Sequence, residues 1–205
     1  MSLAACWREN RIRRAFHQIG EGCALTEPFP DLKGHVEVGA GCTLRGNLVL
    51  RTHLDGVIRI GPNCEIADYA LLMANERIEV GPSTYIAPFA VLRDTNHVFQ
   101  GTETHWRRTP HITMPIVVGA NCYLGERCYV MPGVTIGDGA VIAPGSVVTK
   151  SVRPHEIWAG FPARRVAHRT DPNQTSRLHR HVELVSMFGV QPRENGPSSG
   201  VAPTG

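Results

Sequence analysis

The sequence has few features of a membrane protein or of a nucleic-acid-binding protein. Its 205 residues contain no apolar run approaching the roughly 18 residues that a transmembrane helix needs. The formal net charge is only +3 at pH 7, which is too small for binding a bulk polyanion. Lysine is scarce, since Lys33 and Lys150 are the only lysines among 21 basic residues. We therefore expect neither membrane insertion nor a nucleic-acid partner.

The cysteines form no pattern that indicates disulfides or zinc. None of the six cysteines lies in a Cys-x-x-Cys pair, which is the spacing of zinc ribbons. The first twenty residues carry four arginines, where a secretory signal would need its apolar segment. We expect a cytoplasmic protein with reduced thiols and no bound metal.

Glycine and proline are more frequent than in an average protein, with 21 and 15 residues, and this disfavours a helical bundle. Many of them belong to a repeat of six residues. The first position of each six is Ile, Leu or Val, the second is usually Gly or Ala, and the fifth is small. Sixes begin at Val38, Ile60, Ile66, Val80 and Ile86, and the longest run starts at Val118 and reads VGANCY LGERCY VMPGVT IGDGAV IAPGSV.

A period of six with one large and one small inward residue predicts short strands joined by tight turns. Three sixes close one triangular coil, and successive coils stack at about 4.8 Å, the usual strand spacing. The first position fills the axis of the prism, and the fifth lets each corner close. Cysteines at the fifth position act as small buried apolar groups; these are Cys42, Cys64, Cys122 and Cys128. Cys6 and Cys23 lie outside the repeat as we interpret it.

Breaks in the repeat and the flanking composition predict the organisation of the chain. We expect a helical cap over residues 1–33 and a β-helix over 34–153. The largest break, between Leu92 and Val118, ejects a loop of about residues 96–115, and loops on rigid scaffolds commonly carry function. A C-terminal arm with a short helix is expected over 154–190 and a disordered tail over 191–205.

The repeat resembles the hexapeptide-repeat acyltransferases, and in particular the maltose and galactoside O-acetyltransferases and related sugar and antibiotic acetyltransferases. The resemblance runs from about residue 34 to 169. It implies an all-β fold, the left-handed parallel β-helix, which is an exception to the usual right-handed crossover. It also implies an enzyme that takes acetyl-CoA as acyl donor.

The candidate catalytic residue is His97, in the segment LRDTNHVF that ends the coil before the loop. It resembles the catalytic histidine that relatives carry at the same break, shortly after an Ile-Ala-Pro such as Ile86–Pro88. An imidazole can accept a hydroxyl proton at neutral pH and so act as general base. Its Nδ1–H needs an acceptor, for which Asp94 or a backbone carbonyl is available.

The resemblance also implies coenzyme contacts along the final run of the repeat. The segment with Ala143 and Pro144 corresponds to the wall of the pantetheine tunnel, where Pro144 offers only its carbonyl. Thr149 and Lys150 match the Thr-Lys near the nucleotide end of coenzyme A. Arg164, in the sequence GFPARR, matches a basic residue that meets the coenzyme phosphates.

The resemblance is less specific about the acceptor. Sugar acetyltransferases carry an acidic residue on the coil before the histidine, and Asn75 takes that position here; its amide can still bind a hydroxyl. A simple sugar, glycan, nucleotide sugar, lipid-linked saccharide or antibiotic hydroxyl all fit. Relatives are trimers with sites between subunits, so we expect a homotrimer in which the loop, with Trp106, covers the neighbour's acceptor cleft.

Two other functions use the same prism. A non-catalytic scaffold would bind no coenzyme and would be indifferent to changes at His97. The metal-dependent carbonic anhydrases of this fold need three histidines across a subunit interface, with two of them five residues apart. Here His105 and His111 are six residues apart, and the Thr-Lys and Pro-Ala-Arg features would have no purpose in an anhydrase.

Overall fold

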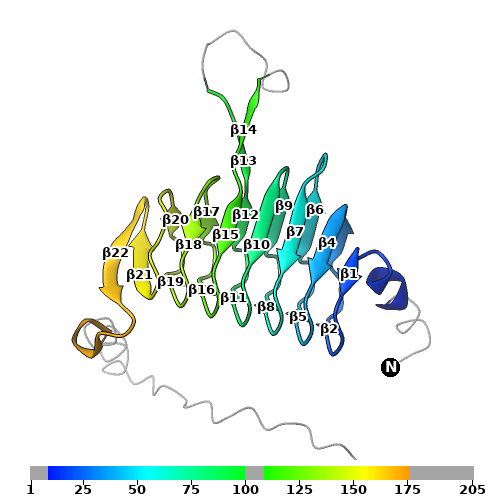
Figure 1. Ribbon diagram of the computed structural model, residues 1–205, viewed down its shortest axis with the longest axis horizontal. Coiled ribbons are helices and arrows are strands. Elements are labelled where there is room, and N and C mark those ends of the chain that lie inside the picture. Colours follow the sequence, from blue (N-terminus) through cyan, green and yellow to red (C-terminus); the bar gives the residue numbers. More distant parts are fainter. Residues whose placement is uncertain (1–8, 100–108, 176–205) are drawn as a thin grey trace, which may run out of the picture.

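A computed structural model describes residues 9–99 and 109–175. Its strands stack in three sheets that form the sides of a prism and are parallel except at the C-terminal end of the second, with one hairpin projecting from the side (Figure 1). The first sheet holds β1 (Gln18–Ile19), β4 (His35–Val38), β7 (Val57–Ile60), β10 (Arg77–Val80), β15 (Ile116–Val118) and β18 (Thr135–Ile136). The second holds β2 (Ala24–Leu25), β5 (Thr43–Leu44), β8 (Glu65–Ile66), β11 (Tyr85–Ile86), β16 (Tyr123–Leu124), β19 (Val141–Ile142), β21 (Glu156–Gly160) and β22 (Ala163–His168). The third holds β3 (Asp31–Lys33), β6 (Val49–Thr52), β9 (Leu71–Ala74), β12 (Val91–Arg93), β17 (Tyr129–Val130) and β20 (Val147–Val148). The predicted parallel β-helix is confirmed.

The core is built from the first position of each six, as the repeat predicts. In the first sheet Val38 pairs with Ile60, Ile60 with Val80, and Val80 with Val118. Each of these side chains is at most 3% exposed. Equivalent stacks run down the second and third sheets, so the aliphatic column is continuous along the prism. A residue buried in this way contributes about 1.5–3 kcal/mol to folding.

A column of small polar hydrogen-bond donors follows the corner between the first and second sheets. The thiols of Cys42, Cys64 and Cys122 each donate to the carbonyl of a glycine on the next coil, at 3.1, 3.1 and 3.2 Å. Thr84 continues the column with a hydroxyl that donates to Gly119 O at 2.8 Å. The four cysteines predicted to be small buried groups are buried and unpaired.

Cys23 belongs to this column too, which corrects our placement of it outside the repeat. Its thiol is buried and donates to Gly39 O at 3.1 Å. The segment Ile19–Ala24, IGEGCA, is itself a six with an aliphatic first position and a small fifth position. The β-helix therefore begins at β1, before the predicted boundary at residue 34.

The two ends of the prism are closed differently. Residues 9–13 are helical and precede β1, so within the described residues the cap is shorter than the predicted 1–33. At the other end β21 and β22 form an antiparallel hairpin that extends the second sheet, and residues 172–175 are helical. The predicted C-terminal arm from residue 176 onward, the predicted tail and Cys6 lie outside the described residues. Among the described helices, none is long and apolar enough to cross a membrane.

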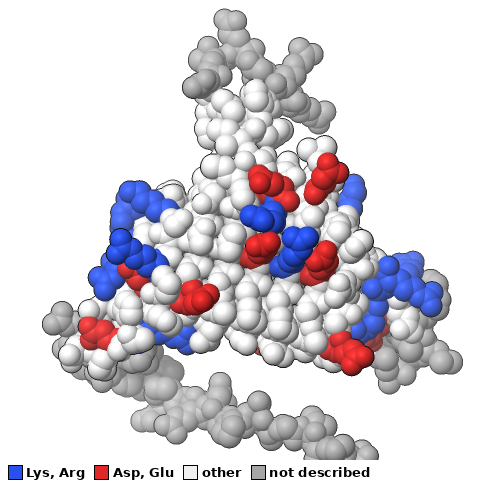
Figure 2. Space-filling view, viewed as in Figure 1, with Lys and Arg blue, Asp and Glu red and all other residues white. Residues whose placement is uncertain are grey.

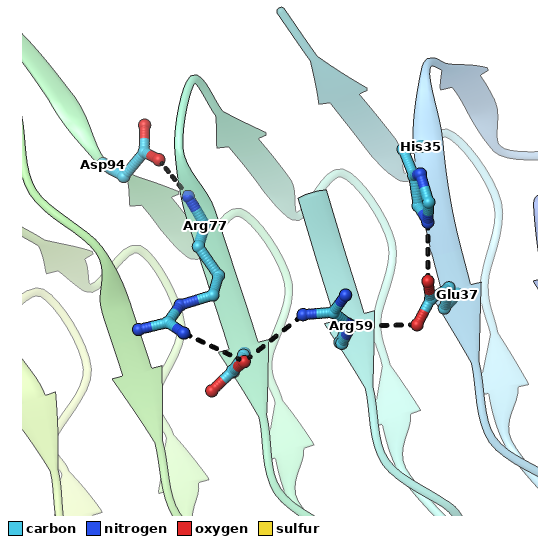
Figure 3. A network of polar contacts seen from close by, with 6 residues as sticks. His35, Glu37, Arg59, Arg77 and Asp94 are labelled. Carbon is cyan, nitrogen blue, oxygen red and sulfur yellow. Dashed lines mark hydrogen bonds and ion pairs between the residues drawn. The ribbon is translucent and has the colours of Figure 1, made fainter. Parts of the chain in front are cut away.

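The outer face of the first sheet carries a row of alternating charges (Figure 2). Glu37 accepts from Arg59 at 2.9 Å, and Arg59 and Arg77 both approach Glu79, at 3.6 and 3.7 Å (Figure 3). At the start of the row His35 Nε2 lies 2.6 Å from Glu37 Oε1. Hydrogen bonds from His35 and then Arg59 lower the pKa of Glu37 below its usual value. Such partly exposed pairs each contribute at most about 1 kcal/mol.

Candidate active site

The candidate site forms at the corner where strands of the third sheet end. Because these strands are parallel and paired in register, the turns that follow them lie at one edge of the sheet. The turn after β9 carries Asn75, and the turn after β20 carries Thr149 and Lys150. Between them β12 leads into a hairpin of β13 (Thr95–His97) and β14 (His111–Thr113). The predicted loop therefore begins and ends as a two-stranded ribbon (Figure 1).

His97 is held on this hairpin by contacts to its ring and its backbone. Its Nδ1 lies 2.8 Å from Thr109 Oγ1, and Thr109 is buried. His111 is its cross-strand partner, with the ring centroids 4.3 Å apart and the planes tilted by 49°. The backbone N–H of His97 donates to Asn96 Oδ1 at 2.9 Å. When Nδ1 carries the proton and donates it to Thr109, the basic atom of the imidazole is Nε2.

A pocket of about 490 Å³ lies against His97. Its wall is mainly apolar, and it includes Thr149 from two coils further along the chain. The lining residues are Asn96, His97, Val98, Phe99, Ile112, Met114, Met131, Pro132 and Thr149. Neither the lining nor the described part of the hairpin contains Lys, Arg, Asp or Glu. The imidazole thus faces an uncharged pocket large enough for a small-molecule ligand.

Asp94 has a different role from the one predicted. The residue is fully buried, and its carboxylate accepts three backbone N–H bonds. Asn75 N donates to Oδ1 at 2.8 Å, and Glu76 N and Arg77 N donate to Oδ2 at 2.7 and 2.9 Å. No bond to His97 is among its contacts with the described residues. Both carboxylate oxygens therefore connect the start of the hairpin to the turn of the preceding coil, and the contact with Arg77 is drawn in Figure 3. Thr109, and not Asp94, is the residue that contacts His97 Nδ1.

The predicted acceptor residues are only partly brought to the pocket. Asn75 is half-buried on the same corner, and its backbone is fixed by Asp94. Its side chain does not line the pocket formed by the described residues. Trp106 lies outside the described residues.

The predicted coenzyme residues are distributed along the third sheet and the closing hairpin. Thr149 lines the pocket, and Lys150 beside it is exposed. Ala143 and Pro144 lie in the turn between β19 of the second sheet and β20 of the third, and therefore at the opposite end of β20 from Thr149. The N–H of Ala143 donates to Trp158 O at 2.8 Å. Arg164 is exposed on β22, where its Nη1 donates to Ala163 O at 2.8 Å. Within the described structure, only Thr149 of these five residues shares the pocket with His97.

Sequence reasoning did not identify Thr109, His111 or Met131 as neighbours of His97. Thr109 and His111 lie in the stretch expected to be a loop, and only the antiparallel pairing of His97 with His111 brings them to the imidazole. Met131 lies on the coil after the hairpin, on the corner that β12 and β17 share. The period of six places Met131 on the same corner as the residues that follow β12, so its position beside the hairpin could have been predicted. The pairing within the hairpin could not, because the hairpin lies outside the repeat.

Comparison with known proteins supports the same class of protein. The family model described as bacterial transferase hexapeptide (six repeats) matches residues 115–150. The chain is 27% identical over 165 residues to galactoside O-acetyltransferase of Escherichia coli, covering 80% of this chain and 70% of that one. The resemblance to the hexapeptide-repeat acyltransferases is confirmed. A shorter match, 40% identical over 62 residues, is to chloramphenicol acetyltransferase of Agrobacterium fabrum and spans 30% of each chain.

Solved structures of two acyltransferases share this fold. AntD, an N-acyltransferase from Bacillus cereus in complex with dTDP and 3-hydroxybutyryl-CoA, aligns with a TM-score of 0.65 at 18% identity over 89% of this chain and 97% of that one. A hexapeptide-repeat acetyltransferase of Vibrio cholerae in complex with acetyl-CoA aligns at 0.53 and 24% identity, over 83% and 81%. The predicted enzyme class, acyltransferase, and the predicted coenzyme agree with these relatives.

Proposed function

We propose that this chain transfers an acetyl group from acetyl-CoA to a hydroxyl of a sugar-like acceptor, with His97 as general base. The observation that carries the proposal is the position of His97. Its Nδ1 is bonded to Thr109, and its ring lies on an uncharged pocket that reaches Thr149. The hexapeptide-repeat acyltransferases carry their catalytic histidine at the same break in the repeat, and their Thr-Lys corresponds to Thr149 and Lys150.

In the proposed reaction the acceptor and the thioester meet in one pocket. His97 Nε2 takes the hydroxyl proton while the acceptor oxygen attacks the thioester carbonyl. A backbone N–H stabilises the oxyanion of the tetrahedral intermediate. The carbon–sulfur bond then breaks, and the departing thiolate takes the proton from the imidazolium. No serine or cysteine lines the pocket among the described residues, which favours direct transfer over an acyl-enzyme.

The coenzyme is proposed to extend along the third sheet. Thr149 and Lys150 lie at one end of β20 and Ala143 and Pro144 at the other, so an extended pantetheine could contact both edges. Lys150 and Arg164 are exposed cations that can pair with the coenzyme phosphates.

The acceptor is proposed to be a hydroxyl-bearing sugar or a related small molecule. The proteins similar to this chain include a galactoside O-acetyltransferase and an N-acyltransferase crystallised with dTDP. Asn75 and Trp106 remain our candidates for acceptor contacts, with the amide of Asn75 as a neutral hydrogen-bonding group.

We further propose that the chain is a cytoplasmic homotrimer with its sites between subunits. Large apolar side chains around the pocket are exposed in the single chain, with Phe99 at 69%, Ile112 at 50% and Met114 at 43%. A surface of this kind is typical of one that a partner covers. Analytical ultracentrifugation tests this point, and a monomer at the assay concentration would contradict it.

The function is tested by measuring coenzyme binding and then turnover. Calorimetry with acetyl-CoA and with coenzyme A should show micromolar binding to the purified protein. A screen of sugar, nucleotide-sugar and antibiotic acceptors, read by release of the free thiol, should then identify turnover. No binding at millimolar coenzyme would overturn the proposal in favour of a non-catalytic scaffold.

A further inference from the structure

Two histidines and a carboxylate converge at the N-terminal end of the first sheet, on coils distant in sequence from the hairpin. His17 directly precedes β1, and His35 opens β4 on the next coil. Their rings are stacked, with centroids 3.8 Å apart and planes 27° apart. Glu37 completes the group, because its Oε1 lies 2.6 Å from His35 Nε2. One potential ligand atom from each of the three residues lies within 4.8 Å of the others.

We propose that His17, His35 and Glu37 bind a divalent cation of the zinc class. Two imidazoles and one carboxylate form a donor set that zinc uses in proteins, with bonds of about 2.0–2.2 Å and water in the fourth position. The three ligand atoms already lie within 4.8 Å of one another, and on binding the exposed His17 ring and Glu37 would rotate to reach those bond lengths. The site goes beyond the proposed transferase activity, in which no metal takes part.

The position of His35 is fixed by the chain around it. Gly34 has φ at +93°, in the left-handed region, and a Cβ there would collide with Thr52 Oγ1. That same hydroxyl, which is buried, accepts the backbone N–H of His35 at 2.9 Å. His17 is tied to the same coil through its backbone N–H, which donates to Val36 O at 2.9 Å. Both imidazoles therefore project from backbone that is held in register.

The carboxylate is oriented from its other side. Arg59 Nε donates to Glu37 Oε2 at 2.9 Å, so Oε1 is left to face His35 (Figure 3). Arg59 also lies 3.6 Å from Glu79, which Arg77 shares, so the row of two arginines and two glutamates leaves no net positive charge beside the cation. Hydrogen-bonded support of a ligating carboxylate is usual in metal sites.

A cation here would link the first coil of the prism to the second. Terminal coils of a solenoid have a neighbour on one side only and open at low free energy. A ligand that binds only the folded chain stabilises it by mass action. We therefore assign the site a structural role at the N-terminal end of the β-helix.

The test uses untagged, chelator-treated full-length protein and Zn²⁺ alone as the probe. Calorimetry should give one Zn²⁺ per chain with micromolar affinity, and the melting temperature should rise with Zn²⁺. His17→Ala removes an exposed ligand whose ring only stacks on His35 among the described residues, so the variant should fold normally. Both it and Glu37→Gln should weaken binding roughly tenfold or more. His53→Ala is the matched control, because His53 is an exposed histidine at the same corner, one coil further along and outside this cluster; it should leave binding unchanged.

Any of four results would overturn the proposal. Binding that is absent at high micromolar Zn²⁺, or unaltered in His17→Ala, would show that these residues are not ligands. Loss of binding in His111→Ala instead would place the cation at the hairpin and would support the carbonic anhydrase alternative. Absorption spectra of the protein with Co²⁺ in place of Zn²⁺ test for cysteine ligands. A thiolate-to-Co²⁺ charge-transfer band would show that cysteines bind the cation and would contradict the assignment. Coenzyme binding is measured separately, so failure of the metal site leaves the proposed transferase function testable.

Discussion

Replacing Asp94 separates its structural role from the role expected from the sequence. The carboxylate accepts N–H bonds from Asn75, Glu76 and Arg77 at 2.7–2.9 Å. Glu76 and Arg77 are exposed, so in a variant water can bond to their backbone N–H groups in place of the carboxylate. Each lost hydrogen bond should then lower the free energy of unfolding by about 1 kcal/mol. Asp94→Ala loses three bonds and should lower the free energy of unfolding by about 3 kcal/mol. Asp94→Asn keeps one oxygen, which in the favoured amide orientation takes the place of Oδ2 and keeps its two bonds, so the bond from Asn75 is lost and the cost is about 1 kcal/mol.

Urea denaturation followed by far-UV circular dichroism measures these changes, with an unchanged m-value as the sign that the transition is still two-state. Asp138→Asn is the matched control. Asp138 is exposed and accepts one backbone N–H, from Ala120 at 2.8 Å, and the amide oxygen can keep that bond. The control should stay within about 0.5 kcal/mol of the wild type. An Asp94→Asn variant with wild-type stability but a lost or pH-shifted activity would refute our account and restore Asp94 as the partner of His97.

Three further predictions concern the site and the core. Thr109→Val removes the group bonded to His97 Nδ1 and should lower kcat about tenfold, the value of one hydrogen bond, with little change in KM; an unchanged kcat would show that Thr109 does not position the imidazole. Lys150→Ala should raise the Kd for coenzyme A in calorimetry more than it lowers kcat, and an effect on kcat alone would contradict a coenzyme contact. Burial raises the pKa of the Cys128 thiol to about 12 from 9.0, so the unfolded thiol ionises first and stability should fall as pH rises from about 9 toward 12. Cys128→Ala should weaken that alkaline loss in urea titrations, and an identical pH dependence would refute the assignment.

The period of six was sufficient to predict the fold because it reports a local rule that every coil repeats. Leu92 and Val118 are both fully or almost fully buried, as their first position in a six predicts. The rule failed at the N-terminal end, where the six from Ile19 to Ala24 is isolated from the next one and was not identified. Glycine and cysteine at its second and fifth positions were nevertheless present in the sequence.

The site was predicted less completely because it depends on pairing across a long insertion. The position of His97 follows from the break in the repeat. Its bond to Thr109 and its contact with His111 follow from an antiparallel hairpin whose register the sequence does not indicate. Asp94 was expected beside His97 because it is three residues away, but the strand carries its side chain to the preceding coil instead.

The central claim is tested most directly by comparing His97→Ala with the wild type in an acetyl-CoA assay with an identified acceptor. Our account predicts a fall in kcat of roughly 10²–10⁴-fold, with the Kd for coenzyme A and the melting temperature nearly unchanged. A variant that keeps full turnover would show that His97 is not the general base, even though the fold is that of the acyltransferases.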